Sequence, residues 1–327
     1  MTPPDLWRPS ASMAMLHRRA RLLQGIRDYF KQAGVLEVET PVCSRFATTD
    51  PAIESFSSRY TGPEAVQGLP LYLQTSPEFP MKRLLCAGSG PIYQICKVFR
   101  DGELGRRHNP EFTLLEWYRP GYDHYDLMGE VAHLINLLAD APMSIEKLSY
   151  AEAFERTLQL NPHLADIAQL RQCALDQGVL GAEELQLEHR DGWLDLLLTH
   201  LIEPTLGVSG MTLLYDYPAS QAALARVSDD SPPVAQRFEL YIKGVEIANG
   251  FYELADPGEQ KSRFAEDNRK RDETGYPLMP MDEYLLDALA EGLPACAGVA
   301  VGIDRLLMVL AKVRDISEVV SFNFRRA

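Results

Sequence analysis

Arginine and aromatic residues recur in one stretch whose spacing could bind a phosphorylated ligand. Residues 98–118 end an apolar strand at Arg100, continue through a polar loop that carries His108 and Asn109, and return along a second strand that begins near Phe112. A guanidinium offers a fork of N–H donors to phosphate, and an aromatic ring offers a face to a base. The stretch therefore indicates nucleotide binding, although a solvated basic loop between two core strands would give the same pattern.

A second stretch reads as two strands joined by a tight turn. A two-residue turn at 243–244 would place Tyr241 opposite Glu246 and Glu239 opposite Ala248. Glu239 and Glu246 would then form a diagonal pair on one face of the hairpin.

Carboxylates in such a pair suit a hard cation. Mg²⁺ is usually held by one or two carboxylates together with substrate phosphates, so Glu239 and Glu246 are candidate ligands. Glu253 follows Asn249 and Gly250, where a kink in the strand would re-aim its side chain. The alternative for Glu239 and Glu246 is a pair of exposed glutamates on a wet sheet face.

Two shorter stretches carry one charged residue each at the start of a helix. Residues 298–306 run from a glycine-containing apolar strand into a helix whose first turn holds Arg305, and residues 75–85 open a helix with Glu78 in its first turn. Small residues allow a ligand to approach closely. A packing joint with a surface arginine, and a glutamate that complements the helix dipole, are the alternatives.

The elements that must position these residues form a mixed pattern. Residues 1–10 are rich in proline and are expected to form a loose arm, and residues 123–205 are expected to be mostly helical. Further helices are expected at 12–33, 257–272, 282–291 and 303–313, and strands at 35–38, 53–57, 71–75, 92–99, 112–118, 212–217, 238–253 and 296–301. Runs of strands without βαβ alternation predict an α+β fold with antiparallel strands.

Composition excludes several classes of protein. The 327 residues carry 46 acidic and 32 basic side chains, a net charge of −14, which disfavours non-specific nucleic-acid binding. The first residues lack the apolar core of a signal peptide, and no apolar run reaches the ~20 residues of a membrane span. The 5 cysteines are scattered and form no CxxC motif, so we expect a cytoplasmic protein without a disulfide framework. Neither a dinucleotide-binding nor a P-loop glycine motif is present.

Taken in order, these stretches resemble the three motifs of class II aminoacyl-tRNA synthetases. GVLEVETP at 34–41 is similar to the first motif, VFRDGELGRRHNPEF to the second and GVAVGIDRL to the third, and HNPEFTLLEWY and EIANGFYEL resemble the lysyl branch. The resemblance spans about residues 12–325. It implies an antiparallel sheet flanked by helices, a catalytic domain at 12–327 behind an N-terminal arm at 1–11, a helical insertion near 140–210, and a homodimer formed through the first motif.

The sequence departs from the lysyl branch in two places. No anticodon-binding domain precedes residue 12, so the chain resembles the stand-alone paralogues that attach lysine or β-lysine to a lysine of elongation factor P, and tRNA is not expected as a partner. In the second motif the family has glutamate two residues after the arginine. Here Gly102 stands there and Glu103 follows.

The resemblance implies a role for each candidate residue. Arg100 and Arg305 are expected to be catalytic. The residues expected to bind ATP are Arg100, Glu103, His108, Asn109, Phe112, Glu246, Ile247, Gly302 and Arg305; those expected to hold Mg²⁺ are Glu239 and Glu246; those expected to bind the amino acid are Ser76, Glu78, Glu116, Tyr118, Asn249, Glu253 and Ala300.

Two of these residues bear on the choice of amino acid. Lysyl-tRNA synthetases usually have alanine where this chain has Ser76 and glycine where it has Ala300. The added hydroxyl and methyl groups predict a preference for β-lysine, with α-lysine a poorer substrate.

Other activities are compatible with the same motifs. They are a tRNA-charging synthetase without an anticodon domain, a catalytically inactive paralogue that binds an amino acid or tRNA, and a relative of the asparagine-synthetase-like branch. The full set of arginines and glutamates disfavours the inactive paralogue.

Overall fold

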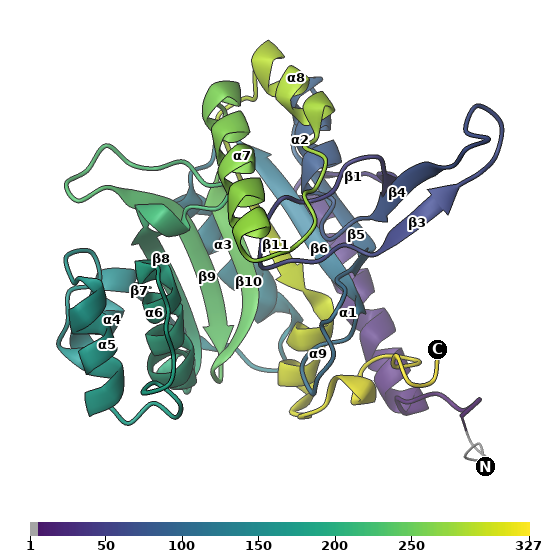
Figure 1. Cartoon of the computed structure of the whole chain (residues 1–327). Coiled ribbons are helices and arrows are strands. Elements are labelled where there is room, and N and C mark those ends of the chain that lie inside the picture. Colours follow the sequence, from purple (N-terminus) through teal and green to yellow (C-terminus); the bar gives the residue numbers. More distant parts are fainter. Residues whose placement is uncertain (1–5) are drawn as a thin grey trace. The chain divides into compact units, whose positions relative to one another are not determined.

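A computed structural model describes residues 6–327, which divide into two compact units (Figure 1). The first unit comprises Met1–Gly121 and Leu254–Ala327, and the second comprises Tyr122–Glu253. Elements of the first unit are α1 (Met13–Gln32), β1 (Leu36–Glu37), β2 (Cys43–Ser44), β3 (Ser57–Tyr60), β4 (Leu69–Leu73), α2 (Glu78–Cys86), β5 (Ile92–Phe99), β6 (Glu111–Pro120), α7 (Pro257–Glu273), α8 (Glu283–Glu291), β11 (Cys296–Gly302) and α9 (Ile303–Ala311). Elements of the second unit are α3 (His124–Leu138), β7 (Ser144–Ser149), α4 (Tyr150–Leu158), α5 (Ile167–Asp176), α6 (Arg190–Leu197), β8 (Gly210–Pro218), β9 (Val234–Ile242) and β10 (Val245–Tyr252).

The first unit is built on strands in the order β1-β5-β6-β11. β6 is antiparallel to both β5 and β11, whereas β1 runs parallel to β5. The apolar stripe of α1 packs on this sheet through Phe30, whose ring stacks on Tyr93 at 4.4 Å and meets Trp117 edge-on at 5.3 Å. β2, β3 and β4 form a separate sheet in the order β2-β4-β3.

A buried carboxylate ties three elements of the first unit together. Asp304, in the first turn of α9, is 2% exposed and accepts from Arg19 Nη1 of α1 at 2.5 Å and from the backbone N–H of Thr113 on β6 at 2.8 Å. The second nitrogen of the same guanidinium donates to Thr113 Oγ1 at 2.8 Å. This network therefore fixes the start of α9, where Arg305 is the next residue.

The arm expected to be loose is ordered in part. Ser10 and Ala11 donate their backbone N–H groups to the carbonyls of Ser321 and Val320 at 2.7 and 3.2 Å. The expectation is therefore wrong for residues 8–10, which hydrogen bonds with the C-terminal segment hold, while residues 1–5 lie outside the described part of the chain. Only contacts with the far end of the chain give this order, so no local pattern could have revealed it.

The second unit is built on strands in the order β10-β9-β8-β7, and helices α4, α5 and α6 pack around a core that includes Trp193 and Phe154. Capping boxes at Ser149 and at Asp166 define the start of α4 and α5. The expected helical stretch is right for these helices but misses β7, which pairs parallel with β8. β7 lies at the end of the strand order and is mostly exposed, so its sequence lacks the alternation that marks a half-buried strand.

Most neighbouring strands in each unit are antiparallel and helices accompany both sets, so the predicted α+β class is confirmed. The strand expected at 53–57 is wrong. Glu54 makes an isolated bridge to Asp101, and β3 begins at Ser57. Within residues 6–327, none of the helices combines the length and the apolar character needed to cross a bilayer.

Replacement of Asp304 should weaken the fold of the first unit. Asp304→Asn removes the charge that balances the mostly buried guanidinium of Arg19, and we expect a loss of about 3 kcal/mol in the free energy of unfolding. Urea denaturation followed by circular dichroism measures it, with Asp287→Asn on the exposed side of α8 as the control. Equal midpoints for the two variants would contradict the role given to Asp304.

Candidate active site

Arg100 stands directly after β5, where the chain turns into the second-motif loop. Its backbone N–H donates to the carbonyl of Pro110 at 2.9 Å, and its guanidinium lies 3.5 Å from the carboxylate of Glu103. Gly102 has φ = +80°, a left-handed conformation in which a side chain is strained. The loop therefore turns on glycine and brings the carboxylate of Glu103 to the arginine. That Glu103 replaces the family's glutamate in binding ATP stays a prediction.

The guanidinium of Arg100 also lies over an aromatic ring. Its carbon is 5.1 Å from the centre of the Phe112 ring, and its Nε is buried without a hydrogen-bond partner in the part of the chain described. A donor in this state costs free energy unless a ligand accepts from it. The geometry suits phosphate binding at Arg100, and stacking of a base on Phe112 stays a prediction.

Arg305 and His108 are in direct contact. Arg305 Nη2 lies 2.5 Å from His108 Nε2, and because a guanidinium can only donate, the imidazole accepts and is neutral. Burial, followed by the positive charge of Arg305, lowers the pKa of His108 in agreement with this. Arg305 lies in the first turn of α9, which Gly302 caps and where a helix favours anions. The structure thus brings two predicted ATP-binding residues together.

Asn109 serves the chain itself. It is 7% exposed, donates to the carbonyl of Glu111 at 2.7 Å and accepts from the backbone N–H of Phe324 at 3.0 Å. These bonds hold the second-motif loop to the C-terminal segment, and a direct contact of Asn109 with ATP stays a prediction.

A cluster of buried polar groups surrounds Glu116 on β6. The carboxylate is 2% exposed and accepts from Ser76 Oγ at 2.8 Å and from the Tyr118 hydroxyl at 2.7 Å. Burial, and next the negative charge of Glu78, raise the pKa of Glu116 to about 7. These four residues belong to the seven that the sequence predicts to bind the amino acid, and the structure brings the four together.

Lys82 belongs to the same cluster and was missed by sequence reasoning. It is 1% exposed, and its Nζ lies 2.6 Å from Glu78 Oε1, one helical turn away on α2. The i, i+4 spacing from Glu78 was the available signal. Glu78, expected to bind an amino group of the substrate, therefore already carries an ion pair with the protein.

Ala300 on β11 is paired in register with Glu116. The Ser76 hydroxyl donates a hydrogen bond to the carboxylate of the same Glu116. Both positions at which this sequence differs from the usual lysyl-tRNA synthetase pattern therefore adjoin Glu116.

The hairpin of the second unit departs from the predicted register. Glu246 lies opposite Tyr241 as predicted, but a bulge between Glu246 and Ala248 shifts the pairing, so Glu239 lies opposite Asn249 and not opposite Ala248. The extra residue of a bulge reverses the alternation beyond it. Asn249 thus lies on the same face as Glu239 and Glu246. With strict alternation and no bulge, Asn249 would lie on the opposite face.

Glu239 is the centre of a network on this face. It is 7% exposed and accepts from Arg237 and from the Tyr241 hydroxyl, while Arg237 Nε donates to Asn249 Oδ1 at 3.2 Å. Sequence reasoning missed Arg237, although its i, i+2 spacing from Glu239 on a strand was a signal. Glu253 is 5% exposed and forms an isolated bridge with Ala225.

The donor set of this hairpin fits a magnesium ion in part. Residues 6–327 hold no group of three or more His, Cys, Asp or Glu side chains that could bind a metal by itself. Two carboxylates on one face suit an ion whose other ligands are phosphates and water. Ile247, in the bulge, is 2% exposed, and its contact with ATP stays a prediction.

Comparison with known proteins gives a consistent result. The family model described as tRNA synthetases class II (D, K and N) matches residues 4–326. A protein of Pseudoalteromonas translucida is 50% identical over 323 residues, 99% of each chain, and one of Erwinia tasmaniensis is 50% identical over 328 residues, 100% of each chain. A protein of Pectobacterium atrosepticum is 49% identical over 327 residues, 100% of each chain. All three are named elongation factor P–(R)-β-lysine ligase.

Loss of either arginine should abolish activation of the amino acid. Arg100→Ala and Arg305→Ala would each remove the charge-assisted contact to phosphate that we predict for that arginine. Such a contact is worth several kcal/mol in a closed site, so we expect at least a ~100-fold lower rate. Amino-acid-dependent exchange of pyrophosphate into ATP measures it, with Arg156→Ala on an exposed strand–helix ion pair as control. A wild-type rate in either variant would remove that arginine from the site.

Glu116 should make stability depend on pH. Since its pKa is raised from 4.5 to about 7, the folded chain binds the proton more tightly than the unfolded chain, and stability falls as pH rises from about 4.5 to 7. Glu116→Gln cannot ionise and should not lose stability in this way. The free energy of unfolding of the variant minus that of the wild type should therefore rise by about 2–4 kcal/mol from pH 5 to pH 8. Urea titrations at both pH values test this, and a constant difference would contradict it.

Proposed function

Because the chain belongs to the class II tRNA synthetases (D, K and N), and within them to the family of ligases to which the relatives belong, we propose that it activates (R)-β-lysine with ATP and transfers the acyl group to a lysine of elongation factor P. The observation that carries the choice of amino acid is the contact of Ser76 with Glu116 and the pairing of Ala300 with the same residue. α-Lysine is the poorer substrate.

In the first step a carboxylate oxygen of the amino acid attacks the α-phosphorus of ATP. The new P–O bond forms as the bond to the β-phosphate breaks and pyrophosphate leaves, which gives an aminoacyl-adenylate. Two anions must meet, so neutralisation and positioning dominate over acid–base chemistry. Arg100 binds the α-phosphate and the carboxylate, and Arg305, backed by the neutral His108, binds the γ-phosphate.

Mg²⁺ would be held by Glu239 and Glu246, and it would neutralise charge on the phosphates. Glu239 accepts from Arg237 and from the Tyr241 hydroxyl, and these bonds hold its carboxylate on the face that it shares with Glu246. The carboxylate also serves to hold the hairpin face in place through Arg237.

The amino-acid pocket must receive ammonium groups. A buried cation needs a carboxylate partner, or it costs several kcal/mol. Glu116, with Ser76 and Tyr118 as its donors, and Glu253 with Asn249 supply acceptors. Glu78, which is already paired with Lys82, would contact the amino group nearest the carboxylate of the substrate.

In the second step the neutral ε-amine of the acceptor lysine attacks the acyl carbon. The acyl C–O bond breaks, AMP leaves and the amine loses a proton. The names of the relatives support elongation factor P as the acceptor, and the reaction would take place in the cytoplasm. We also propose a homodimer formed through residues 34–41 and a catalytic domain over 12–327 with a helical insertion.

The acceptor can be identified by mass. We expect that the chain with ATP and β-lysine adds one β-lysyl group to elongation factor P and leaves tRNA unchanged, because the adenylate reacts with the amine presented to it. Intact-mass measurement of the factor and acid-gel analysis of tRNA read out both acceptors. Charging of tRNA without any gain of mass on the factor would favour the tRNA-charging alternative.

The amino-acid preference should respond to Ala300. Ala300→Gly removes the methyl group paired with Glu116, so the kcat/KM ratio of β-lysine over α-lysine should fall by about 10-fold, the effect of one methyl group in a pocket. Ala297→Gly, also on β11, serves as control. A wild-type preference for α-lysine would overturn the assignment of the donor.

A further inference from the structure

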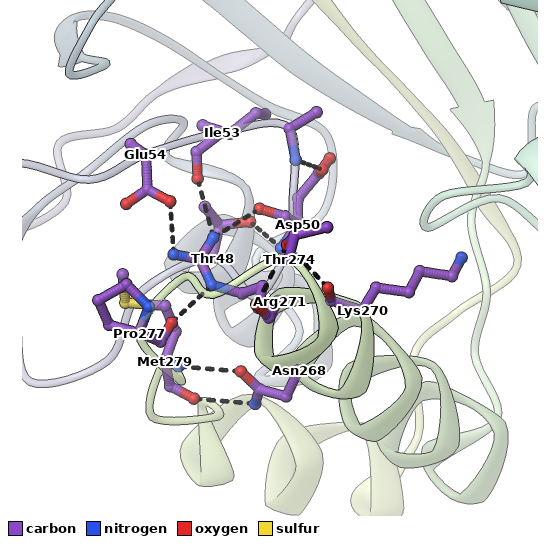
Figure 2. A network of polar contacts seen from close by, with 11 residues as sticks. Thr48, Asp50, Ile53, Glu54, Asn268, Lys270, Arg271, Thr274, Pro277 and Met279 are labelled. Atoms are coloured by element: carbon purple, nitrogen blue, oxygen red, sulfur yellow. Dashed lines mark hydrogen bonds and ion pairs between the residues drawn. The ribbon is translucent and has the colours of Figure 1, made fainter. Parts of the chain in front are cut away.

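Arg271 on α7 is a fully buried cation that lies outside every motif considered above. Its side chain is 0% exposed. Figure 2 shows its donors: Nε bonds the carbonyl of Pro277 at 2.8 Å, Nη1 the carbonyl of Asp50 at 3.1 Å, and Nη2 the carboxylate of Glu54 at 2.5 Å. Removal of a guanidinium from water costs several kcal/mol unless its donors are satisfied, so the surrounding chain is held in the one arrangement that satisfies them.

Neighbouring side chains reinforce this arrangement. Thr49 Oγ1 donates to Asp267 Oδ2 at 3.0 Å, and Asn268 exchanges two hydrogen bonds with the backbone of Met279 at 3.0 and 2.9 Å. The bond of Thr49 ties the loop at 48–54 to α7, and the bonds of Asn268, which Figure 2 shows, tie the segment after α7 to the same helix.

The same loop bonds the strand end that carries Arg100. The carbonyl of Glu54 accepts the backbone N–H of Asp101 at 2.9 Å, in an isolated antiparallel bridge. Asp101 follows Arg100 directly. A continuous path of hydrogen bonds thus runs from Arg271 through the side chain and then the backbone of Glu54 to the residue beside Arg100.

We propose that Arg271 is a positioning residue for adenylate formation. By holding Glu54 it fixes the amide of Asp101 and so the direction in which Arg100 leaves the end of β5. The proposal rests on the proposed function, in which Arg100 binds the α-phosphate. A role in stability alone is the competing explanation, and the two differ in what they predict for a folded variant.

Arg271→Lys keeps the charge but loses the planar fork that reaches several acceptors at once. We expect kcat for ATP–pyrophosphate exchange with β-lysine to fall by about 10- to 100-fold, since a small misplacement of a catalytic group has effects of this size. KM for ATP should change less, because Arg100 acts mainly on charge that develops in the transition state. Arg269→Lys is the matched control: it lies on the same helix, 52% exposed, and pairs with Glu266 and Glu273.

A second measurement does not depend on activity. Amide hydrogen exchange in the peptide that contains Asp101 should quicken by about 10-fold or more in Arg271→Lys and stay unchanged in Arg269→Lys, because local opening sets the rate. Core amides of β6 serve as the internal reference for global stability. If the wild type activates neither lysine isomer, the proposed function fails, and this measurement alone then decides whether Arg271 holds the loop.

Chemical rescue separates positioning from folding. Arg271→Ala should regain part of its exchange activity when guanidinium is added below denaturing concentrations, and methylammonium should not replace it. Should the Arg271 variants fail to fold, Glu54→Gln, which keeps a neutral acceptor, tests the same link and should lose less activity. A folded Arg271→Lys, or in its place Glu54→Gln, with wild-type kcat or wild-type protection of Asp101 would overturn the proposal.

Discussion

The cost of removing charge from water is the constraint on which the first unit depends. Asp304, Arg271 and Lys82 are each almost fully buried, and each is paired with an opposite charge: Arg19, Glu54 and Glu78. Breaking such a pair leaves an uncompensated buried charge, which costs more than the intact pair contributes. The pairs therefore fix the positions of α1, α7 and the loop at 48–54. Arg305 directly follows Asp304, and Arg100 directly precedes Asp101, whose backbone N–H donates to Glu54.

Glu116 is the exception to this rule, and the exception has a chemical meaning. Its buried carboxylate bonds two hydroxyl groups, and its pKa is raised to about 7, first by burial and then by Glu78. A carboxylate in this state gains most from the arrival of a substrate cation. In the proposed amino-acid pocket, this partly compensated charge would match an ammonium group of the substrate.

The hairpin of the second unit shows how one extra residue decides a set of neighbours. Without the bulge after Glu246, strict alternation would direct Asn249 to the opposite face. With it, Arg237 bonds both Glu239 and Asn249, and the face becomes a connected polar network. Fully connected networks of this kind hold their members rigidly, whereas partly connected ones destabilise the fold.

The sequence by itself determined the elements and the types of side chain at the site, because apolar periodicity and motif spacing are local properties. Strand 92–99, helix α7 and the group of Ser76, Glu78, Glu116 and Tyr118 were all predictable in this way. The tertiary structure alone decided the bulge in β10, the burial of Lys82, the order of residues 8–10 and the link from Arg271 to Asp101. Each of these depends on a contact between segments distant in the sequence, or on one of two strand registers that the sequence allows equally well. The free energy that selects among the possibilities comes from burial and from the pairing of charges that only the folded chain brings together.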